Sequence, residues 1–383
     1  MPTRFHDLGE SLIGRAGSRA AIPTPALICD IGLLESNIST MARWASEHSV
    51  ALRPHVKSHK SALVAALQLR AGARGLAFAK PSEAEAVVRS LIRHGWTDPV
   101  NALITSPVAP AAVAALGPLA EICCLTVVVD EPEAIDELAT VGSDSNPLLI
   151  LCDVDVGLGR TGVRTARDAV AVVKQILRHR TLRFEGVQGY GGHLQHLADR
   201  SRRQAATTES TEHLATIIAA LEKGGYEVPW RSGGGTGTCR IDAELGVLNE
   251  LQPGSYVFMD REYADSLGDD AEGVFAHSLF VATTVVSANQ AAFVTVDAGL
   301  KSMATDAGPP AVVNGATSVE FQFFGDEHGL VTRDPDRLLQ RGDRLELVAP
   351  HCDPTVDRYD VMWLVSGDTV VGVTPVDARG CSQ

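Results

Sequence analysis

The chain has 383 residues, of which 45% are hydrophobic and 21% are charged, which predicts a globular protein of two domains, or of one barrel with an appendage. Its formal net charge of −14 at pH 7 argues against binding to nucleic acids or to anionic membranes, because either partner requires a concentrated basic face. The N-terminal residues lack an apolar signal core, and no later run is long and apolar enough to span a bilayer, so we expect a cytoplasmic protein with a small-molecule partner.

Short apolar runs alternate with helical patterns over the first two thirds of the chain. Residues 26–30 are predicted to form a buried strand, and the spacing of apolar residues predicts a helix near 32–48. Eight strand-like runs follow, namely the run that ends near Lys57 and those at residues 75–79, 100–106, 125–130, 148–155, 184–190, 230–234 and 248–258. Eight runs separated by Ala-rich amphipathic helices are typical of a (β/α)8 TIM barrel, with a doubly wound sheet as the alternative.

The pattern changes after about residue 273, where helical periodicity stops and strands alternate with turns. The expected strands lie at residues 278–287, 292–297, 318–324, 344–348 and 361–365. The expected fold class is therefore α/β, with a barrel over residues 32–273 and a C-terminal β domain over residues 274–383.

The stretch Leu52–Lys60 ends a strand-like run with two lysines and two histidines. Lys57 lies near the C-terminal end of the predicted strand, where α/β folds place their chemistry. If the chain stays extended, His55, Lys57 and His59 share one side, because side chains alternate along a strand. Such a cationic cluster suits an anion and favours the neutral amine that a Schiff-base lysine needs. The alternative is a solvated start of the next helix, but we interpret Lys57 as a cofactor-carrying lysine.

A glycine-rich segment, Ser232–Gly237, follows the seventh predicted strand. Consecutive glycines let backbone N–H groups approach a phosphate closely, and Ser or Thr hydroxyls complete the cradle. Barrels commonly bind phosphate after strands seven and eight. We therefore expect a phosphate group to contact Ser232, Gly234, Gly235 and Thr236, and the alternative is a flexible turn.

The segment Arg53–Lys60, with the sequence RPHVKSHK, resembles the cofactor-lysine segment of the D-threonine aldolase and D-serine dehydratase family. These are pyridoxal 5′-phosphate enzymes of the alanine-racemase-like fold, fold type III, and the resemblance covers nearly the whole chain. It implies that Lys57 carries the cofactor, that the β domain of residues 274–383 also takes in residues 1–31, and that the protein is a homodimer.

The loop of residues 153–162 follows the fifth predicted strand, and its glycines allow the loop to fold back so that Arg160 points into the site. A fixed positive charge there would hold the phenolate oxygen of the cofactor and stabilise an electron-rich intermediate. The alternative is an ordinary loop arginine paired with Asp153 or Asp155.

Two further segments are similar to segments of the same family. After the sixth strand, the resemblance places Tyr190 on the cofactor and His196 toward the substrate, whereas His193 departs from the aldolase pattern and its role is open. After the eighth strand, Ser255 and Tyr256 resemble an adjoining phosphate contact.

The sequence PHCDPT at residues 350–355 predicts a metal site in the β domain. In an extended segment His351 and Asp353 project together while Cys352 points away. A lone His-x-Asp is usually a surface pair, but this segment is similar to the metal segment of the family. Imidazole plus carboxylate favours Mn²⁺ or Mg²⁺, whereas a thiolate would select Zn²⁺, and the family's dehydratases carry cysteine where this chain has Asp353.

The resemblance implies a carbon–carbon lyase of the D-threonine aldolase type that cleaves D-β-hydroxy-α-amino acids to glycine and an aldehyde. Threonine would give acetaldehyde, and 3-hydroxyaspartate would give glyoxylate. The alternatives are a D-serine or D-3-hydroxyaspartate dehydratase of the same family, an amino-acid racemase and a non-catalytic pyridoxal-phosphate-binding protein. The racemase is disfavoured because a simple proton transfer needs no metal pair, and the carrier because such proteins resemble a barrel alone.

Overall fold

The computed structural model describes residues 11–268, 274–313, 319–333 and 338–383. The chain forms two compact units, each assembled from several segments. The barrel unit consists of residues 41–57, 62–254 and 380–383, and the β unit consists of the residues up to 40, 58–61 and 255–379.

Within the described residues of the barrel unit, eight parallel strands follow one another around a ring in the order β2-β9-β8-β7-β6-β5-β4-β3. A bridge between His55, just beyond β2, and Ala77 of β3 closes the ring. The (β/α)8 prediction is confirmed, because the strands lie within or against the predicted apolar runs. Their bounds are β2 (Ala51–Leu52), β3 (Leu76–Phe78), β4 (Asn101–Ile104), β5 (Cys124–Val129), β6 (Leu148–Asp153), β7 (Leu182–Gly189), β8 (Trp230–Gly233) and β9 (Glu250–Leu251).

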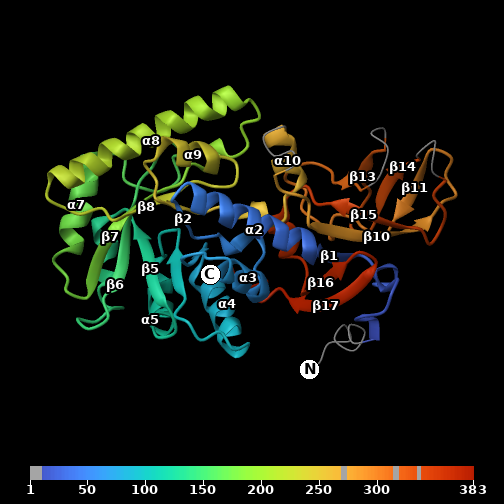
Figure 1. Cartoon of the computed structure of the whole chain (residues 1–383), viewed down its shortest axis with the longest axis horizontal. Coiled ribbons are helices and arrows are strands. Elements are labelled where there is room, and N and C mark those ends of the chain that lie inside the picture. The colour runs from blue at the N-terminus through green and yellow to red at the C-terminus, as the bar shows by residue number, and fades with distance from the viewer. Residues whose placement is uncertain (1–10, 269–273, 314–318, 334–337) are drawn as a thin grey trace. The chain divides into compact units, whose positions relative to one another are not determined.

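Helices cover the outside of these strands, and Figure 1 shows α7 and α8 beyond β6 and β7. The start of several helices is marked by the local sequence. Thr165 and Asp199 precede α7 and α8 and accept hydrogen bonds from the third residue of each helix. Proline is the first residue of α4 and α6. The helices that follow β1 to β8 are α2 (Ile31–Glu47), α3 (Ala62–Arg70), α4 (Pro81–Arg93), α5 (Leu116–Ala120), α6 (Pro132–Leu138), α7 (Ala166–Ile176), α8 (Arg200–Lys223) and α9 (Cys239–Leu245).

The β unit is built on a mainly antiparallel sheet with the order β13-β14-β11-β10-β1-β16-β17, and β15 pairs with both β10 and β12. The N-terminal strand β1 lies inside this sheet, antiparallel to β10 and parallel to β16. Ile28 of β1 and Trp363 of β16 belong to its buried core. The bounds are β1 (Ala26–Asp30), β10 (Leu279–Ser287), β11 (Phe293–Val296), β12 (Ala311–Val312), β13 (Phe321–Phe323), β14 (Gly329–Thr332), β15 (Arg344–Val348), β16 (Val361–Ser366) and β17 (Thr369–Pro375).

Two short helices belong to the β unit. The helix α10 (Arg261–Leu267) belongs to this unit because its first N–H groups donate to Ala349 and Pro350, at 3.0 and 3.1 Å. The compact units consequently divide after residue 254, whereas the pattern of the sequence placed the change near residue 273. The second helix, α11 (Cys352–Val356), interrupts a region for which only strands and turns were expected.

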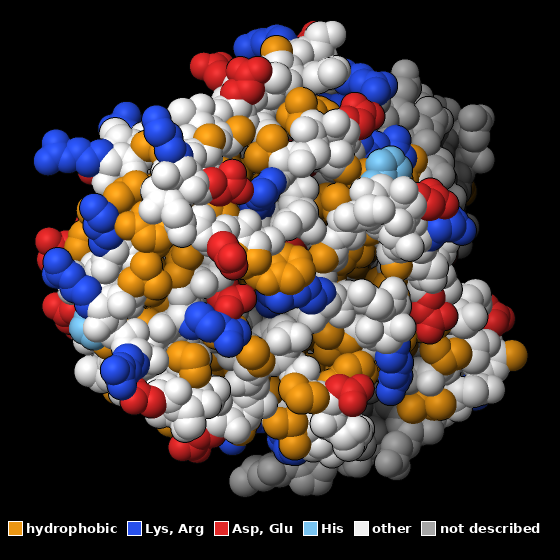
Figure 2. Space-filling view, turned by 60° about the vertical axis from the view of Figure 1, so that its left-hand side comes forward, with side chains coloured by type: hydrophobic (Ala, Val, Ile, Leu, Met, Phe, Trp, Pro, Cys, Tyr) orange, Lys and Arg blue, Asp and Glu red, His pale blue; other side chains and the backbone are white. Residues whose placement is uncertain are grey.

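Charged side chains of both signs lie on the surface of the described residues (Figure 2). Figure 2 shows acidic and basic side chains interspersed over one face. In the parts of the chain that the structure describes, no helix has both the length and the apolar character needed to cross a bilayer.

Candidate functional site

Lys57 lies on a turn and not on a strand. The strand β2 ends at Leu52, and Val56–Ser58 forms a single 3-10 turn, so the expectation that His55, Lys57 and His59 share one side of an extended segment is wrong. The ring of His55 fixes the start of this turn: its Nδ1 accepts a hydrogen bond from the Lys57 amide at 3.4 Å, while Nε2 donates to Thr105 Oγ1 at 3.1 Å. The turn presents Lys57 at the end of the first barrel strand.

The four residues after Lys57, Ser58–Ser61, belong to the β unit and are held there by Lys60. Its ammonium forms an ion pair with Asp357 at 2.9 Å and donates to the carbonyl oxygen of Ala378 at 3.3 Å. The amide of Ala378 donates in return to the carbonyl oxygen of Lys60 at 3.0 Å. The Lys60 amine is thus committed to structural contacts.

A buried carboxylate, Glu250, organises the polar interior of the barrel. Arg53 and Arg74 reach its two oxygen atoms at 2.8 and 3.0 Å, and the Ser232 hydroxyl donates to it at 2.7 Å. Burial raises the pKa of Glu250, but the two guanidinium groups and the hydrogen bonds outweigh this effect and lower it. The Ser232 side chain is thus engaged inside the barrel, and its predicted phosphate contact stays a prediction.

The loop after β6 carries Arg160. Asp155 Oδ1 accepts the N–H groups of Gly157 and Gly159 at 3.0 and 2.9 Å, which folds the loop back on itself as the glycines predicted. The guanidinium of Arg160 lies 5.8 Å from the ring centroid of Tyr190, within range of a cation–π contact. The structure therefore brings together two of the predicted cofactor residues.

Asp153 lies at the end of β6 beneath this loop and is buried. It accepts hydrogen bonds from Gln188 Nε2 at 2.9 Å and from the Thr161 hydroxyl at 2.8 Å. Burial raises the pKa of Asp153 to about 6, against the lowering effect of these hydrogen bonds.

The glycine-rich loop follows β8 as predicted, and its tight path has a visible cause. Gly234 has φ +65°, and a Cβ atom there would stand 2.6 Å from Asp242 Oδ2. Thr236 is buried in the same loop. The sequence motifs did not single out Asp242 or the neighbouring Thr238 and Gln195, because their contacts join separate segments.

Two histidines follow β7. His196 is exposed, so its predicted substrate contact stays a prediction. His193, whose role the sequence left open, faces outward and lines a cavity of about 450 Å³ together with Glu209 and His213 of α8.

The predicted metal-ligand pair, His351 and Asp353, lies in the β unit, with a local structure different from the one expected. His351 is extended, but α11 begins at Cys352, so Asp353 is on the first turn of a helix. The pair still faces together, with His351 Nε2 4.0 Å from Asp353 Oδ1. Cys352 is not simply directed away: it is buried, and its Sγ lies 3.3 Å from Asp353 Oδ1.

Two carboxylates that the sequence analysis missed surround this pair. Asp306 Oδ2 accepts a hydrogen bond from His351 Nδ1 at 2.7 Å. Asp260 caps α10 through the Tyr263 amide at 3.0 Å and also accepts the Cys352 amide at 2.8 Å. Burial acts to lower the pKa of His351, but Asp353, Asp306 and Asp260 together raise it. Among the described residues, no group of three or more His, Cys, Asp or Glu side chains is arranged to hold a metal ion.

The other predicted phosphate contacts lie in a 3-10 turn of the β unit, Ser255–Val257. Ser255 and Tyr256 are buried, and the Tyr256 ring lies 5.7 Å from Phe275. Their predicted cofactor contact stays a prediction.

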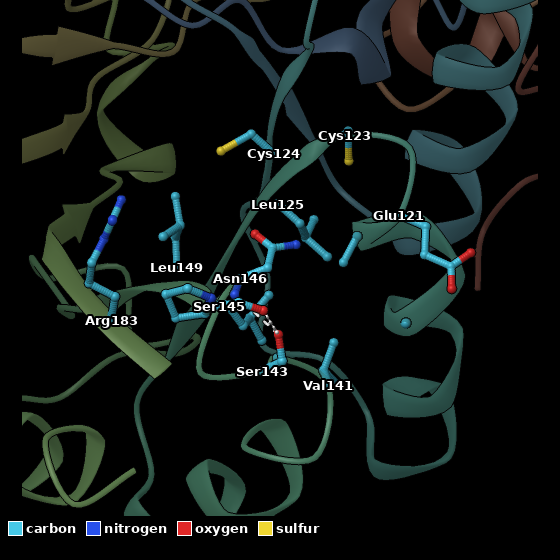
Figure 3. A pocket seen from close by; sticks show the side chains of 15 residues that line it. Glu121, Cys123, Cys124, Leu125, Val141, Ser143, Ser145, Asn146, Leu149 and Arg183 are labelled. Atoms are coloured by element: carbon cyan, nitrogen blue, oxygen red, sulfur yellow. Dashed lines mark hydrogen bonds between the residues drawn. The ribbon is translucent and has the colours of Figure 1, made fainter. Parts of the chain in front are cut away.

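A cavity of about 360 Å³ opens at the opposite end of the barrel, where β5, β6 and β7 begin (Figure 3). Its thiols, Cys123 and Cys124, point in different directions. Burial raises the pKa of Cys123 to about 12, so this thiol is not a ready nucleophile. In TIM-barrel enzymes the active site lies at the C-terminal ends of the strands. This cavity lies at their N-terminal ends and is therefore separate from the candidate residues.

Two family models match the chain. The N-terminal domain of alanine racemase matches residues 29–262, and a putative serine dehydratase domain matches residues 278–365.

Individual relatives are similar over nearly the full length. A D-threonine aldolase of Arthrobacter sp. is 35% identical over 366 residues, which cover 95% of this chain and 94% of the relative. A 3-hydroxy-D-aspartate aldolase of Paracoccus denitrificans (strain Pd 1222) is 37% identical over 367 residues, which cover 94% and 92%. The crystal structure of D-threonine aldolase from Filomicrobium marinum matches with a TM-score of 0.88 at 35% identity and covers 95% of this chain and 97% of that chain.

Proposed function

The chain belongs to the alanine racemase-like family that includes D-threonine aldolase and 3-hydroxy-D-aspartate aldolase, and on this premise we propose that it cleaves D-β-hydroxy-α-amino acids to glycine and an aldehyde. The proposed reaction uses pyridoxal 5′-phosphate and a divalent metal ion. A homodimer and a cytoplasmic location stay predictions from the sequence.

The barrel unit offers the groups that pyridoxal phosphate requires: a primary amine, a fixed cation beside an aromatic ring, and a glycine-rich backbone loop. Lys57 would hold the cofactor covalently, Arg160 would neutralise its phenolate oxygen, and the loop of residues 234–236 would bind its phosphate. When bound, the cofactor supplies an electron sink for the electron pair released by bond cleavage.

The β unit offers a donor set that fits a hard divalent ion. His351 Nε2 and Asp353 Oδ1 are 4.0 Å apart, and two ligands each about 2.1 Å from one ion can lie up to about 4.2 Å apart. Imidazole and carboxylate suit Mn²⁺ or Mg²⁺, with waters completing the shell. The ion supplies positive charge that lowers the pKa of a bound hydroxyl group.

The reaction then needs a base at the hydroxyl group of the substrate. His196 would accept the proton of the β-hydroxyl, the Cα–Cβ bond would break, and the β-carbon would leave as the aldehyde. A proton delivered to Cα completes glycine. The fixed charge of Arg160 would favour the electron-rich state between these two proton transfers.

The observation that carries an aldolase over a dehydratase is the chemistry at Asp353. Its carboxylate stands beside His351, where a dehydratase of the family would carry a thiolate for Zn²⁺. The neighbouring Cys352 does not replace that thiolate, because it is buried and contacts the Asp353 carboxylate. The serine dehydratase domain matched over residues 278–365 keeps the dehydratase as the second candidate.

Product analysis separates the two reactions. We expect the full-length protein, supplied with pyridoxal phosphate and Mn²⁺, to convert D-threonine to equimolar glycine and acetaldehyde and to leave L-threonine unchanged. Retro-aldol cleavage retains the hydroxyl oxygen in the aldehyde, whereas elimination expels it and releases ammonia with 2-oxobutanoate. Predominant 2-oxobutanoate with stoichiometric ammonia would reject the aldolase.

A further inference from the structure

Behind the glycine-rich loop, three polar side chains are buried that the proposed chemistry does not use. Gln195, Thr238 and Asp242 have exposed fractions of 1%, 2% and 4%. They come from the segment after β7, from the end of the glycine-rich loop, and from the first turn of α9. Burial of a polar group is costly unless the group forms hydrogen bonds.

Thr238 is the centre of this group. Its Oγ1 accepts hydrogen bonds from the amide of Gly235 at 3.3 Å and from Gln195 Nε2 at 3.1 Å, and it donates to Asp242 Oδ2 at 2.7 Å. Because a hydroxyl group has a single proton, donation to Asp242 turns its lone pairs toward the two N–H donors. Asp242 therefore sets the orientation in which Thr238 supports the loop.

Gln195 connects this loop to the segment that follows β7. Its Nε2 also donates to the carbonyl oxygen of Gly191 at 3.1 Å, and its Oε1 accepts the amide of Gly237 at 2.9 Å. A Cβ atom on Gly237 would collide with the backbone oxygen of Gln195. The two segments are thus fastened to each other through one amide side chain.

The carboxylate of Asp242 lies directly against the loop backbone. A small cavity of about 20 Å³, the size of one water molecule, separates it from α8. Its lining includes Gly234, Thr238 and Asp242, together with Thr207, Ser210 and Thr211 of α8, and Asp242 is its one charged member among the described residues. A negative charge on Asp242 therefore has no cation beside it in this lining.

We propose that Asp242 is a positioning residue that, through Thr238 and Gln195, holds the glycine-rich loop in its phosphate-binding conformation and adjusts the affinity for the cofactor through its own charge. The inference rests on the proposed assignment of this loop to the phosphate of pyridoxal phosphate.

The charge of Asp242 changes near neutral pH. Burial raises the pKa of its carboxyl group to about 7, against the lowering effect of the hydrogen bond from Thr238. The helix α9 also carries Cys239, Arg240 and Glu244. Burial raises the pKa of the Cys239 thiol to about 12, so this thiol stays neutral, and neither Arg240 nor Glu244 lines the cavity beside Asp242. Ionisation of Asp242 places a negative charge beneath a loop that binds a phosphate dianion, which weakens binding.

The first test removes the Thr238 hydroxyl group while keeping the shape of its side chain. Thr238→Val should weaken binding of pyridoxal phosphate to the full-length chain by about tenfold or more, because the three hydrogen bonds of the Thr238 hydroxyl group are lost. Binding of pyridoxal, which lacks the phosphate, should change by less than about twofold. Equilibrium absorbance titration with each compound gives both dissociation constants.

The matched control is Thr207→Val, the same change on the α8 side of the same cavity. The Thr207 hydroxyl donates to the Arg203 carbonyl oxygen at 2.7 Å and does not touch the loop. The Thr207→Val variant should bind pyridoxal phosphate as the unchanged protein does. Thr238→Ser should also bind it with nearly unchanged affinity, because serine keeps the hydroxyl group.

The second test uses Asp242→Asn, whose amide oxygen still accepts the Thr238 proton but carries no charge. Near pH 6 this variant should bind pyridoxal phosphate as tightly as the unchanged protein. Between pH 6 and pH 8 the ratio of the two dissociation constants should move in favour of the variant, and comparison at each pH cancels the titration of the phosphate itself.

The outcomes distinguish this inference from the proposed function. Equal binding of pyridoxal phosphate by Thr238→Val and Thr207→Val, or an equal loss for pyridoxal, would overturn the positioning role. A constant ratio for Asp242→Asn across this pH range would overturn the effect of charge. An unchanged protein that binds no pyridoxal phosphate would overturn the proposed cofactor, and this inference with it.

Discussion

The imidazole of His351, a proposed metal ligand, is oriented by a hydrogen bond at its other ring nitrogen. Nδ1 donates to Asp306 at 2.7 Å, so the lone pair is on Nε2, the atom that faces Asp353. Carboxylates that hold a histidine in this way orient the ring and make the ligating nitrogen more basic. Asp306 would therefore strengthen metal binding without touching the ion.

We expect Asp306→Ala to weaken Mn²⁺ binding about 10- to 100-fold, because the ring loses its orienting partner. Calorimetric titration of the full-length chain with Mn²⁺ measures this directly, and the cofactor absorbance should be unchanged. Asp360→Ala is the matched control, since Asp360 is an exposed carboxylate of the same unit that pairs with Arg379. Equal Mn²⁺ affinity of the two variants would remove Asp306 from the metal site.

At the scale of elements, the first and last barrel strands of the chain, β2 and β9, pair with each other, and a buried ion pair lies at that junction. Arg53 follows β2, Glu250 begins β9, and their side chains are 4% and 1% exposed. The desolvated charges depend on each other, because removal of one leaves the other buried without compensation.

Glu250→Gln should therefore lower the free energy of unfolding by about 3 to 5 kcal/mol. Glu222→Gln makes the same change in an exposed pair with Arg231 and should cost about 0 to 1 kcal/mol. Denaturant unfolding of both variants measures this difference, and a similar small loss in each would mean that the buried pair does not stabilise the junction of β2 and β9.

The strands were predictable from the sequence because parallel barrel strands are buried on both faces and appear as continuous apolar runs. The turn at Lys57 was not, because His-Val-Lys-Ser contains no glycine or proline to mark it. Asp306 and Asp260 were missed for a different reason: their partners lie 45 and 92 residues away, and no local pattern encodes such contacts. The loops of Arg160 and Gly234 were found because their glycines are a local signal.

For the whole molecule, two buried acids make stability depend on pH. Burial raises the pKa of Asp153 to about 6 and that of Asp242 to about 7, from an ordinary value of 3.8. A raised carboxyl pKa means that the folded state binds the proton more tightly than the unfolded state. Their contribution is fully present below about pH 4 and is lost as pH rises through 6 and 7.

We expect the double variant Asp153→Asn/Asp242→Asn to unfold with a flatter pH dependence than the unchanged protein between pH 4 and pH 7. Unfolding free energies at a series of pH values in one buffer mixture measure the slope. The same slope in both proteins would show that these carboxyl groups are ionised throughout the range.

The position of β1 in its sheet has a consequence for how the chain is made. This strand precedes the barrel in the chain, yet its two partners, β10 and β16, begin at residues 279 and 361, after all eight barrel strands have been synthesised. A nascent chain therefore carries an apolar strand with two unpaired edges while the barrel strands are being made, and such edges readily join other chains. Faithful production of this protein depends on keeping that strand apart from other nascent chains on the polysome until both β10 and β16 have been synthesised.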